Sequence, residues 1–190
     1  KAKRKTDKPL WFNELKQYLV NSWKFELLNN GLEADDAVNI ARNLLKNEYN
    51  VFISTTDKDL IKCIPGKYIN ARDFTIIRTS KEKANEAFWT SMIVGDSSDN
   101  ITGLKGRGKK YAEYLFKDPI IPYKELVINA YKIDLLEDWE NEFNKMYKLL
   151  YILDDFEGFQ IKLINKEEGE FGERDITSRE VSAEKHTNLW

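Results

Sequence analysis

The sequence predicts an α/β protein in which a mostly parallel sheet with flanking helices is followed by a small helical module. The short apolar run Val51–Ser54 is typical of a buried strand in a parallel sheet. Strand-like and helix-like segments alternate up to residue 94, and only helical patterns follow as far as residue 153. With 190 residues, 42% of them hydrophobic, the chain can bury the core of one large domain or two small ones.

Two helices and one strand are expected in the N-terminal part. After a basic start at residues 1–8, apolar residues recur at helical spacing over 10–20. Apolar and charged residues then alternate over 23–28, which predicts a strand. A turn at 29–31 leads to an amphipathic helix over 34–45.

Short elements are expected next to the predicted buried strand. They are a helix over 60–64 and a β pair, 68–70 with 74–78, at a sheet edge. Longer helices are predicted over 81–94, from Lys109 to before Pro119, over 123–132 and over 135–153. We therefore expect a partial α/β core over residues 1–92, a helical module over 93–160 and a charged, solvated tail over 161–190.

The composition limits the chemistry. A net charge of −2 gives no overall basic signature, so any affinity for nucleic acid must come from local patches. The chain has a single cysteine, Cys63, which argues against an internal disulfide. It also has a single histidine, His186, so histidine catalysis and a zinc site with histidine and cysteine ligands are not expected. Oxygen ligands remain, which suit magnesium or manganese. The single cysteine also fits a reducing cytoplasm, and no apolar run approaches a membrane span.

Three acidic clusters each lie at a predicted element boundary. They are Glu33/Asp35/Asp36, Asp57/Asp59 and Asp96/Asp99. Parallel strands would bring the first two clusters to one sheet edge, and residues three apart share a face on a helical turn. Converging carboxylates repel one another unless cations neutralise them. We therefore expect two divalent ions roughly 3.5–4 Å apart, which suits phosphodiester hydrolysis. Taken singly, each cluster also fits a helix-start charge, a polar turn or a surface pair.

A glycine-rich and basic segment follows the last acidic cluster. Gly103, Gly106 and Gly108 permit a tight turn whose backbone can approach another surface closely. Lys109 and Lys110 open the next helix, whose first N–H groups can face an anion. The alternative is a polar connection between two helices.

These motifs together resemble the 5′-nuclease superfamily, which includes phage and bacterial 5′-to-3′ exonucleases, the exonuclease domain of bacterial DNA polymerase I and flap endonucleases. The matching motifs are Gly31–Asp36, Ser54–Leu60, Gly95–Ile101 and Gly103–Lys110, and the resemblance covers residues 1–159. It implies a PIN/resolvase-like core followed by a helix–three-turn–helix, with the phage-type branch favoured by the compact size. Thr102 and Arg107 depart from the family's usual proline and apolar residue.

The resemblance implies roles for the acidic residues. Asp35, Asp36 and Asp57 would contribute to a tighter metal site, and Asp59, Asp96 and Asp99 to a second. Glu33 would be a ligand or would orient a bound water. The implied cofactors are two Mg²⁺ or Mn²⁺ ions, and the implied products carry a 5′-phosphate and a 3′-hydroxyl.

The resemblance also implies a grip on duplex DNA. The implied contact residues are Gly103, Lys105, Gly106, Arg107, Gly108, Lys109 and Lys110, with a monovalent cation such as K⁺ held by loop carbonyls. Local charge agrees, because residues 103–117 carry five bases and one acid. The phosphates of a strand can be held there without reading bases.

Lys1 and Arg4 match the family's Lys-x-x-Arg motif. Lys1 would then stabilise the scissile phosphate and Arg4 would steer it, and the alternative is an ordinary solvated segment. Trp11, Phe12 and Tyr18 on the first helix are expected to pack in the core, with stacking on unpaired bases as the alternative.

The sequence therefore predicts a structure-specific 5′-to-3′ exonuclease or flap endonuclease that acts on DNA with free 5′ ends or flaps, or on an RNA primer in a hybrid. We expect the protein to be located in the cytoplasm of a bacterium or of a phage-infected host cell. Relatives carry two aspartate-bearing strands before the Lys-x-x-Arg motif, so we expect a longer protein or a separate N-terminal piece. The alternatives are a non-cleaving DNA-binding fragment and a related ribonuclease.

Overall fold

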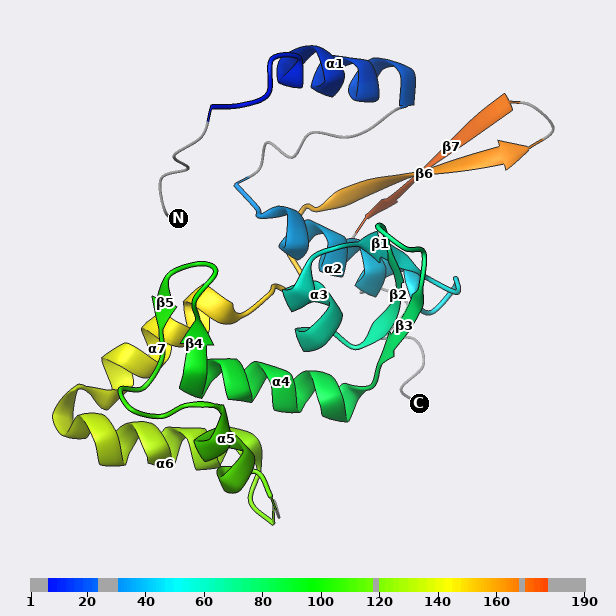
Figure 1. Ribbon diagram of the computed structural model, residues 1–190. Helices are drawn as coiled ribbons and strands as arrows, with labels where there is room; N and C mark the ends of the chain where they lie inside the picture. Colours follow the sequence, from blue (N-terminus) through cyan, green and yellow to red (C-terminus); the bar gives the residue numbers. More distant parts are fainter. Residues whose placement is uncertain (1–6, 24–30, 118–119, 168–169, 178–190) are drawn as a thin grey trace, which may run out of the picture.

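A computed structural model describes residues 7–23, 31–117, 120–167 and 170–177, with side chains up to residue 161 (Figure 1). The helices are α1 (Phe12–Trp23), α2 (Ala34–Leu45), α3 (Lys58–Cys63), α4 (Lys81–Val94), α5 (Lys109–Leu115), α6 (Tyr123–Leu135), the 3₁₀ turn η1 (Leu136–Asp138) and α7 (Trp139–Leu150). The strands are β1 (Ile53–Thr55), β2 (Gly66–Asn70), β3 (Ile76–Thr79), β4 (Gly95–Asp96), β5 (Ile101–Thr102), β6 (Gln160–Glu167) and β7 (Glu170–Thr177). The α/β class predicted from the sequence is confirmed.

A three-stranded mixed sheet holds the first part of the fold. β1 pairs with β2 in parallel across the crossover helix α3, and β2 pairs with β3 in an antiparallel hairpin. The buried residues Ile53, Leu60, Ile64 and Tyr68 join this sheet to α3. Among the described strands the sheet is thus mixed, where the sequence predicted a mostly parallel one, because a short turn reverses the chain between β2 and β3.

Helix α2 is positioned by its apolar face and by its polar first turn. Ala37, Ile40 and Leu44 recur at helical spacing and pack on Phe159, just before β6. Asn39 is fully buried in the same interface, where its amide donates to the Leu153 carbonyl at 2.9 Å and to Asp154 at 3.0 Å. A buried amide must find such partners, so this contact fixes α2 against the segment that follows α7.

The helical module forms around the second half of α4. Met92, Ile93, Val127 and Tyr131 are its most deeply buried large side chains, and the Tyr131 hydroxyl donates to the Met92 carbonyl at 2.6 Å. Figure 1 shows α5, α6 and α7 gathered beside this end of α4. Because α4 also contacts α3, it joins the module to the sheet, and the predicted boundary between residues 92 and 93 stays a prediction.

Three predicted elements differ from the structure. The helix expected over 135–153 is divided at Leu136, whose φ of 51° ends α6, and the chain leaves α7 at Leu150. Trp23, expected to begin a strand, is the last residue of α1, and residues 24–30 lie outside the described part. The prediction of a charged, solvated tail over 161–190 is wrong for residues 161–167 and 170–177, because these residues lie in the antiparallel β6–β7 hairpin. Backbone pairing satisfies N–H and C=O groups whatever the side-chain charge, so a charge count does not exclude strands.

Helix α1 corrects a further expectation. None of its residues is buried, and Trp11, Phe12 and Tyr18 are 69%, 39% and 56% exposed. The predicted core packing of these aromatic residues is therefore wrong in the described part of the chain. Helical spacing determines which face is apolar, but not what covers it. No described helix is long and apolar enough to cross a bilayer.

Candidate metal centre

Six of the seven predicted acids line one cleft of about 200 Å³. They are Glu33, Asp35 and Asp36 from the start of α2, Asp59 from α3, and Asp96 and Asp99 from the β4–β5 hairpin. The cleft also touches α7 and the residues after it. Acids up to 66 positions apart in the sequence thus face a common space, as the sequence predicted.

Asp59, Asp96 and Asp99 form the tightest group. Each offers one carboxylate oxygen, and these three oxygens lie within 4.8 Å of one another. Hard oxygen donors at this spacing fit a single magnesium or manganese ion. The structure therefore brings together the three residues that the sequence analysis assigned to the second metal site.

The route by which Asp96 and Asp99 meet differs from the prediction. They do not share a helical turn, because Asp96 lies in β4 and pairs with Ile101 of β5. A tight turn between the two strands, with Asn100 at φ 59°, returns Asp99 to the cleft. The side chain of Asp96 is held by Ser98, whose hydroxyl donates at 2.6 Å and whose N–H donates at 2.7 Å.

Two neighbouring carboxyls have opposite pKa shifts. The Ser98 hydrogen bonds lower the pKa of Asp96, because they stabilise its charged form. Burial raises the pKa of Asp59, and the negative charge of Asp96 raises it further, while Lys62 opposes both effects. A cation bound between Asp59 and Asp96 would remove the repulsion that Asp59 experiences.

The three acids at the start of α2 form a further part of the lining, the α2 wall. Asp36 accepts a hydrogen bond from the Leu153 N–H at 2.9 Å and one from the Glu33 N–H at 3.4 Å. Its carboxylate therefore fastens the segment after α7 to α2 and also faces the cleft. Burial raises the pKa of Asp35, and the charges of Asp36 and Glu33 raise it further. A cation bound nearby would also reduce the repulsion among these three carboxylates.

Asp57 has a different position. Its carboxylate caps α3, accepting from the Asp59 N–H at 2.8 Å and from the Leu60 N–H at 3.5 Å. It is not among the residues that line the cleft. Capping is the role that the structure shows for Asp57, and by fixing the first turn of α3 it also positions Asp59.

Sequence reasoning missed four residues with polar side chains or a thiol that line the cleft. Cys63, Ser91, Lys148 and Tyr151 line it beside the acids. Burial and the nearby carboxylates raise the pKa of the Cys63 thiol to about 11, so it stays protonated at neutral pH. Lys148, exposed on α7, is the one cation among the described lining residues. No local sequence signal marks it, because α7 reaches the cleft only through tertiary packing. Lys1 and Arg4 lie outside the described residues.

The glycine-rich segment serves two different purposes. A Cβ at Gly103 would lie 2.2 Å from the Ile93 carbonyl oxygen, so this glycine permits β5 to lie against the end of α4. Gly106 has a φ of 74° and Gly108 caps α5, and a Cβ at either would meet nothing within 4 Å. Of the three glycines in this segment, only Gly106 and Gly108 leave the backbone open to another molecule.

The predicted contact side chains of this segment are also unequal. Lys105, Lys109 and Lys110 are exposed, and Lys109 pairs with Glu113 at 3.5 Å. Arg107, by contrast, is bound to Asp134 and lies over the Tyr111 ring, 4.4 Å from its centre. The three lysines are thus open to solvent, while the Arg107 guanidinium is already engaged within the molecule.

No protein-family model matches the chain. The chain is 29% identical over 158 residues to DNA polymerase I of Borreliella burgdorferi, covering 72% of this chain and 17% of that protein. It is 31% identical over 100 residues to the 5′-3′ exonuclease of Bacillus subtilis, covering 46% of this chain and 34% of that protein. It therefore spans only a minor part of these relatives.

Among solved structures, a lysine-to-alanine mutant of T5 5′-exonuclease is similar with a TM-score of 0.48 and 16% identity, covering 74% of this chain and 76% of that one. The two sequence relatives, together with the acidic motifs that meet in the cleft, support the resemblance to the 5′-nuclease superfamily.

Proposed function

We propose that this chain carries the metal centre of a 5′-to-3′ exonuclease or flap endonuclease that hydrolyses phosphodiester bonds of DNA. The observation that carries the proposal is the single cleft lined by six carboxylates, three of which can share one ion. The homology to a 5′-3′ exonuclease supports the same activity. Free 5′ ends and flaps are the proposed substrates, and an RNA primer in a hybrid is a further candidate.

The donor set fits hard divalent cations. Asp59, Asp96 and Asp99 would hold one ion, and the acids at the start of α2 would hold a second or orient a water molecule. When bound, such ions supply an activated water and stabilise negative charge on the phosphate and the leaving oxygen. Mg²⁺ is the first candidate because carboxylate oxygens are its usual protein ligands.

The remaining residues of the cleft have proposed roles of their own. Asp36 holds the α2 wall in place through the Leu153 N–H, and Ser98 keeps Asp96 charged and oriented. Lys148 presents a cation at the rim, where it can meet the anionic phosphate that is brought to the carboxylates. Together these residues bind and orient both the cations and the substrate.

A 5′-labelled flap DNA tests the proposal. We expect the full chain to release labelled product with Mg²⁺ and none with EDTA, and the Asp96→Asn/Asp99→Asn variant to release none with either. Glu137→Gln, which removes an exposed acid outside the cleft, should cut like the unaltered chain. Cleavage that persists in EDTA or in the double variant would overturn the proposal. DNA binding without any product would favour the non-cleaving alternative.

A further inference from the structure

A second concave surface, the lysine groove, lies beside the metal centre. It is formed by Lys62 of α3, by Lys83, Glu86, Thr90 and Ser91 of α4, and by Lys109 of α5. Helices α3 and α5 both pack on α4, and Figure 1 shows them on either side of it. The groove has a volume of about 470 Å³, more than twice that of the acidic cleft.

The groove is basic on a chain that is slightly acidic. Lys62, Lys83 and Lys109 are all exposed, against a single acid, Glu86. The net charge of the whole chain is −2, so this excess is local. Thr90 adds a hydroxyl to the same wall. A concave surface of this kind attracts an anionic ligand with repeated charges.

The groove adjoins the metal centre. Ser91 lines both hollows, and Lys62 of the groove acts electrostatically on Asp59 of the cleft. Gly95, which also lines the groove, directly precedes Asp96. A ligand lying in the groove would therefore lie beside the carboxylates.

The groove also adjoins the glycine-rich turn. Lys109 follows Gly108, whose α-carbon faces open space. The exposed Lys105 and Lys110 lie in the same segment. The groove thus adjoins both the open turn and the metal centre.

We propose that the lysine groove binds the phosphate backbone of a DNA strand as it passes from the turn at residues 105–108 to the metal centre. This inference rests on the proposed function, which makes DNA the substrate. Lysine ammonium groups on flexible stems suit phosphates, because they add affinity and register without reading bases. Under this proposal Lys62 and Lys83 bind DNA phosphates, although neither residue belongs to the acidic motifs or to the turn.

The salt dependence of DNA binding tests the groove separately from cleavage. A fluorescein-labelled DNA duplex is titrated with the full chain in EDTA at several NaCl concentrations, and anisotropy gives the affinity. Each lost phosphate contact lowers the slope of log K against log[NaCl] by about 0.9. We expect Lys62→Ala/Lys83→Ala to bind more weakly, with a slope smaller by about 2.

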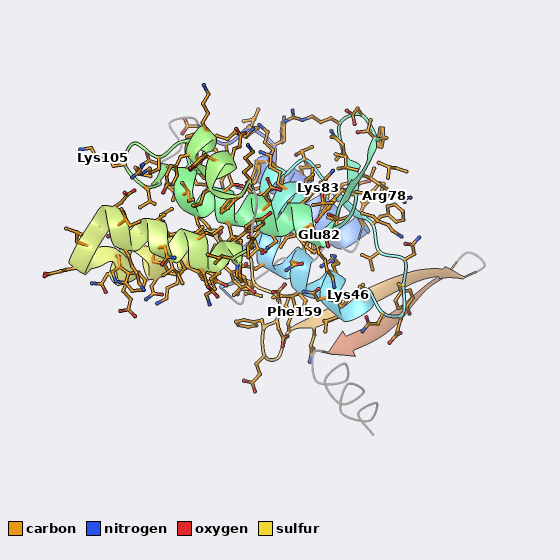
Figure 2. All side chains as sticks on the ribbon, turned by 90° about the horizontal axis from the view of Figure 1, so that it is seen from below. Lys46, Arg78, Glu82, Lys83, Lys105 and Phe159 are labelled. Atoms are coloured by element: carbon orange, nitrogen blue, oxygen red, sulfur yellow. The ribbon has the colours of Figure 1, made fainter. Side chains whose placement is uncertain are left out.

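Two further variants show that the effect belongs to the groove. Glu86→Gln removes its acid and should tighten binding, a gain that loss of folding cannot produce. Lys46→Ala removes a lysine at the end of α2, a different element from the helix α4 that carries Lys83 (Figure 2), and it is not among the residues of the groove, so affinity and slope should stay unchanged. Equal effects of Lys46→Ala and the groove variants would overturn the proposal.

The outcomes separate the groove from the proposed function. Unchanged affinity and slope in Lys62→Ala/Lys83→Ala, with Mg²⁺-dependent cleavage retained, overturn the groove and leave the nuclease standing. A chain that binds DNA with the predicted slope changes but never cleaves supports the groove and overturns the nuclease. A chain that binds no DNA overturns both.

Discussion

Arg107 donates two hydrogen bonds to the carboxylate of Asp134, from Nε at 2.8 Å and from a terminal nitrogen at 2.7 Å. The pair joins the glycine-rich turn to α6, and Tyr111 covers the guanidinium from α5. A two-pronged pair of this kind fixes orientation as well as distance. It holds the open turn, which the resemblance assigns to DNA, against the helical module.

We expect Arg107→Ala and Asp134→Ala each to lower the free energy of unfolding, and the double variant to lose much less than the sum. The reason is that both single changes break the same pair and leave one charge without its partner. Urea unfolding at neutral pH measures this coupling. The pair lowers the pKa of Asp134, so its contribution is present above the ordinary carboxyl pKa and is lost in acid, once Asp134 is protonated. Additive losses, or a coupling that persists in acid, would contradict this prediction.

Gly103→Ala and Gly108→Ala should separate folding from DNA binding. An alanine at position 103 would place its Cβ against backbone atoms of Ile93, Val94 and Gly95, which cannot move independently, so we expect a loss on the order of 1–3 kcal/mol in stability. Position 108 has a negative φ and open space around it, so the same change should cost little. Its effect should appear in DNA affinity, because a methyl group would then stand between backbone and phosphate. Thermal unfolding and anisotropy measure the two effects, and equal unfolding temperatures for both variants would sink this prediction.

The Asp59→Asn substitution should make the stability of the folded chain much less dependent on Mg²⁺. Without divalent cations we expect this variant to be at least as stable as the unaltered chain, because it removes the repulsion from Asp96 and Asp99. Added Mg²⁺ should raise the melting temperature of the unaltered chain, since a ligand that binds only the folded state stabilises it. The variant should gain much less, and Glu137→Gln, as control, should gain fully. A full magnesium response in Asp59→Asn would remove Asp59 from the metal site.

Tyr68→Phe should reduce the loss of stability at high pH. Tyr68 is fully buried, its hydroxyl donates to the Ile64 carbonyl at 2.6 Å, and burial raises its pKa from 10.0 to about 12. A raised folded-state pKa contributes stability that is full below pH 10 and is lost as the pH rises toward 12. The melting temperature of Tyr68→Phe should therefore fall less than that of the unaltered chain over this range. Tyr114→Phe, at a position 78% exposed, should follow the unaltered chain.

The acidic motifs allowed the convergence of six acids in one cleft to be predicted, because their chemistry is local. Carboxylates at element boundaries, with hardly any histidine or cysteine, leave oxygen ligands for a hard cation. The same reasoning assigned Asp57 to the metal, whereas the structure shows its oxygen bound to the first N–H groups of α3. A carboxylate at a helix start fits both roles by sequence, and only the direction of the side chain distinguishes them.

The sequence by itself determined the fold class, the boundaries of α2 and α4 and the acids that converge, because periodicity, caps and residue type act over a few positions. Tertiary structure alone decided that Lys148 faces the acids, that Arg107 is bound by Asp134 and that Lys62, Lys83 and Lys109 share one groove. Each of these depends on how helices far apart in the chain pack together. Their apolar faces drive that packing through buried area, which is non-directional and so leaves no motif in the sequence.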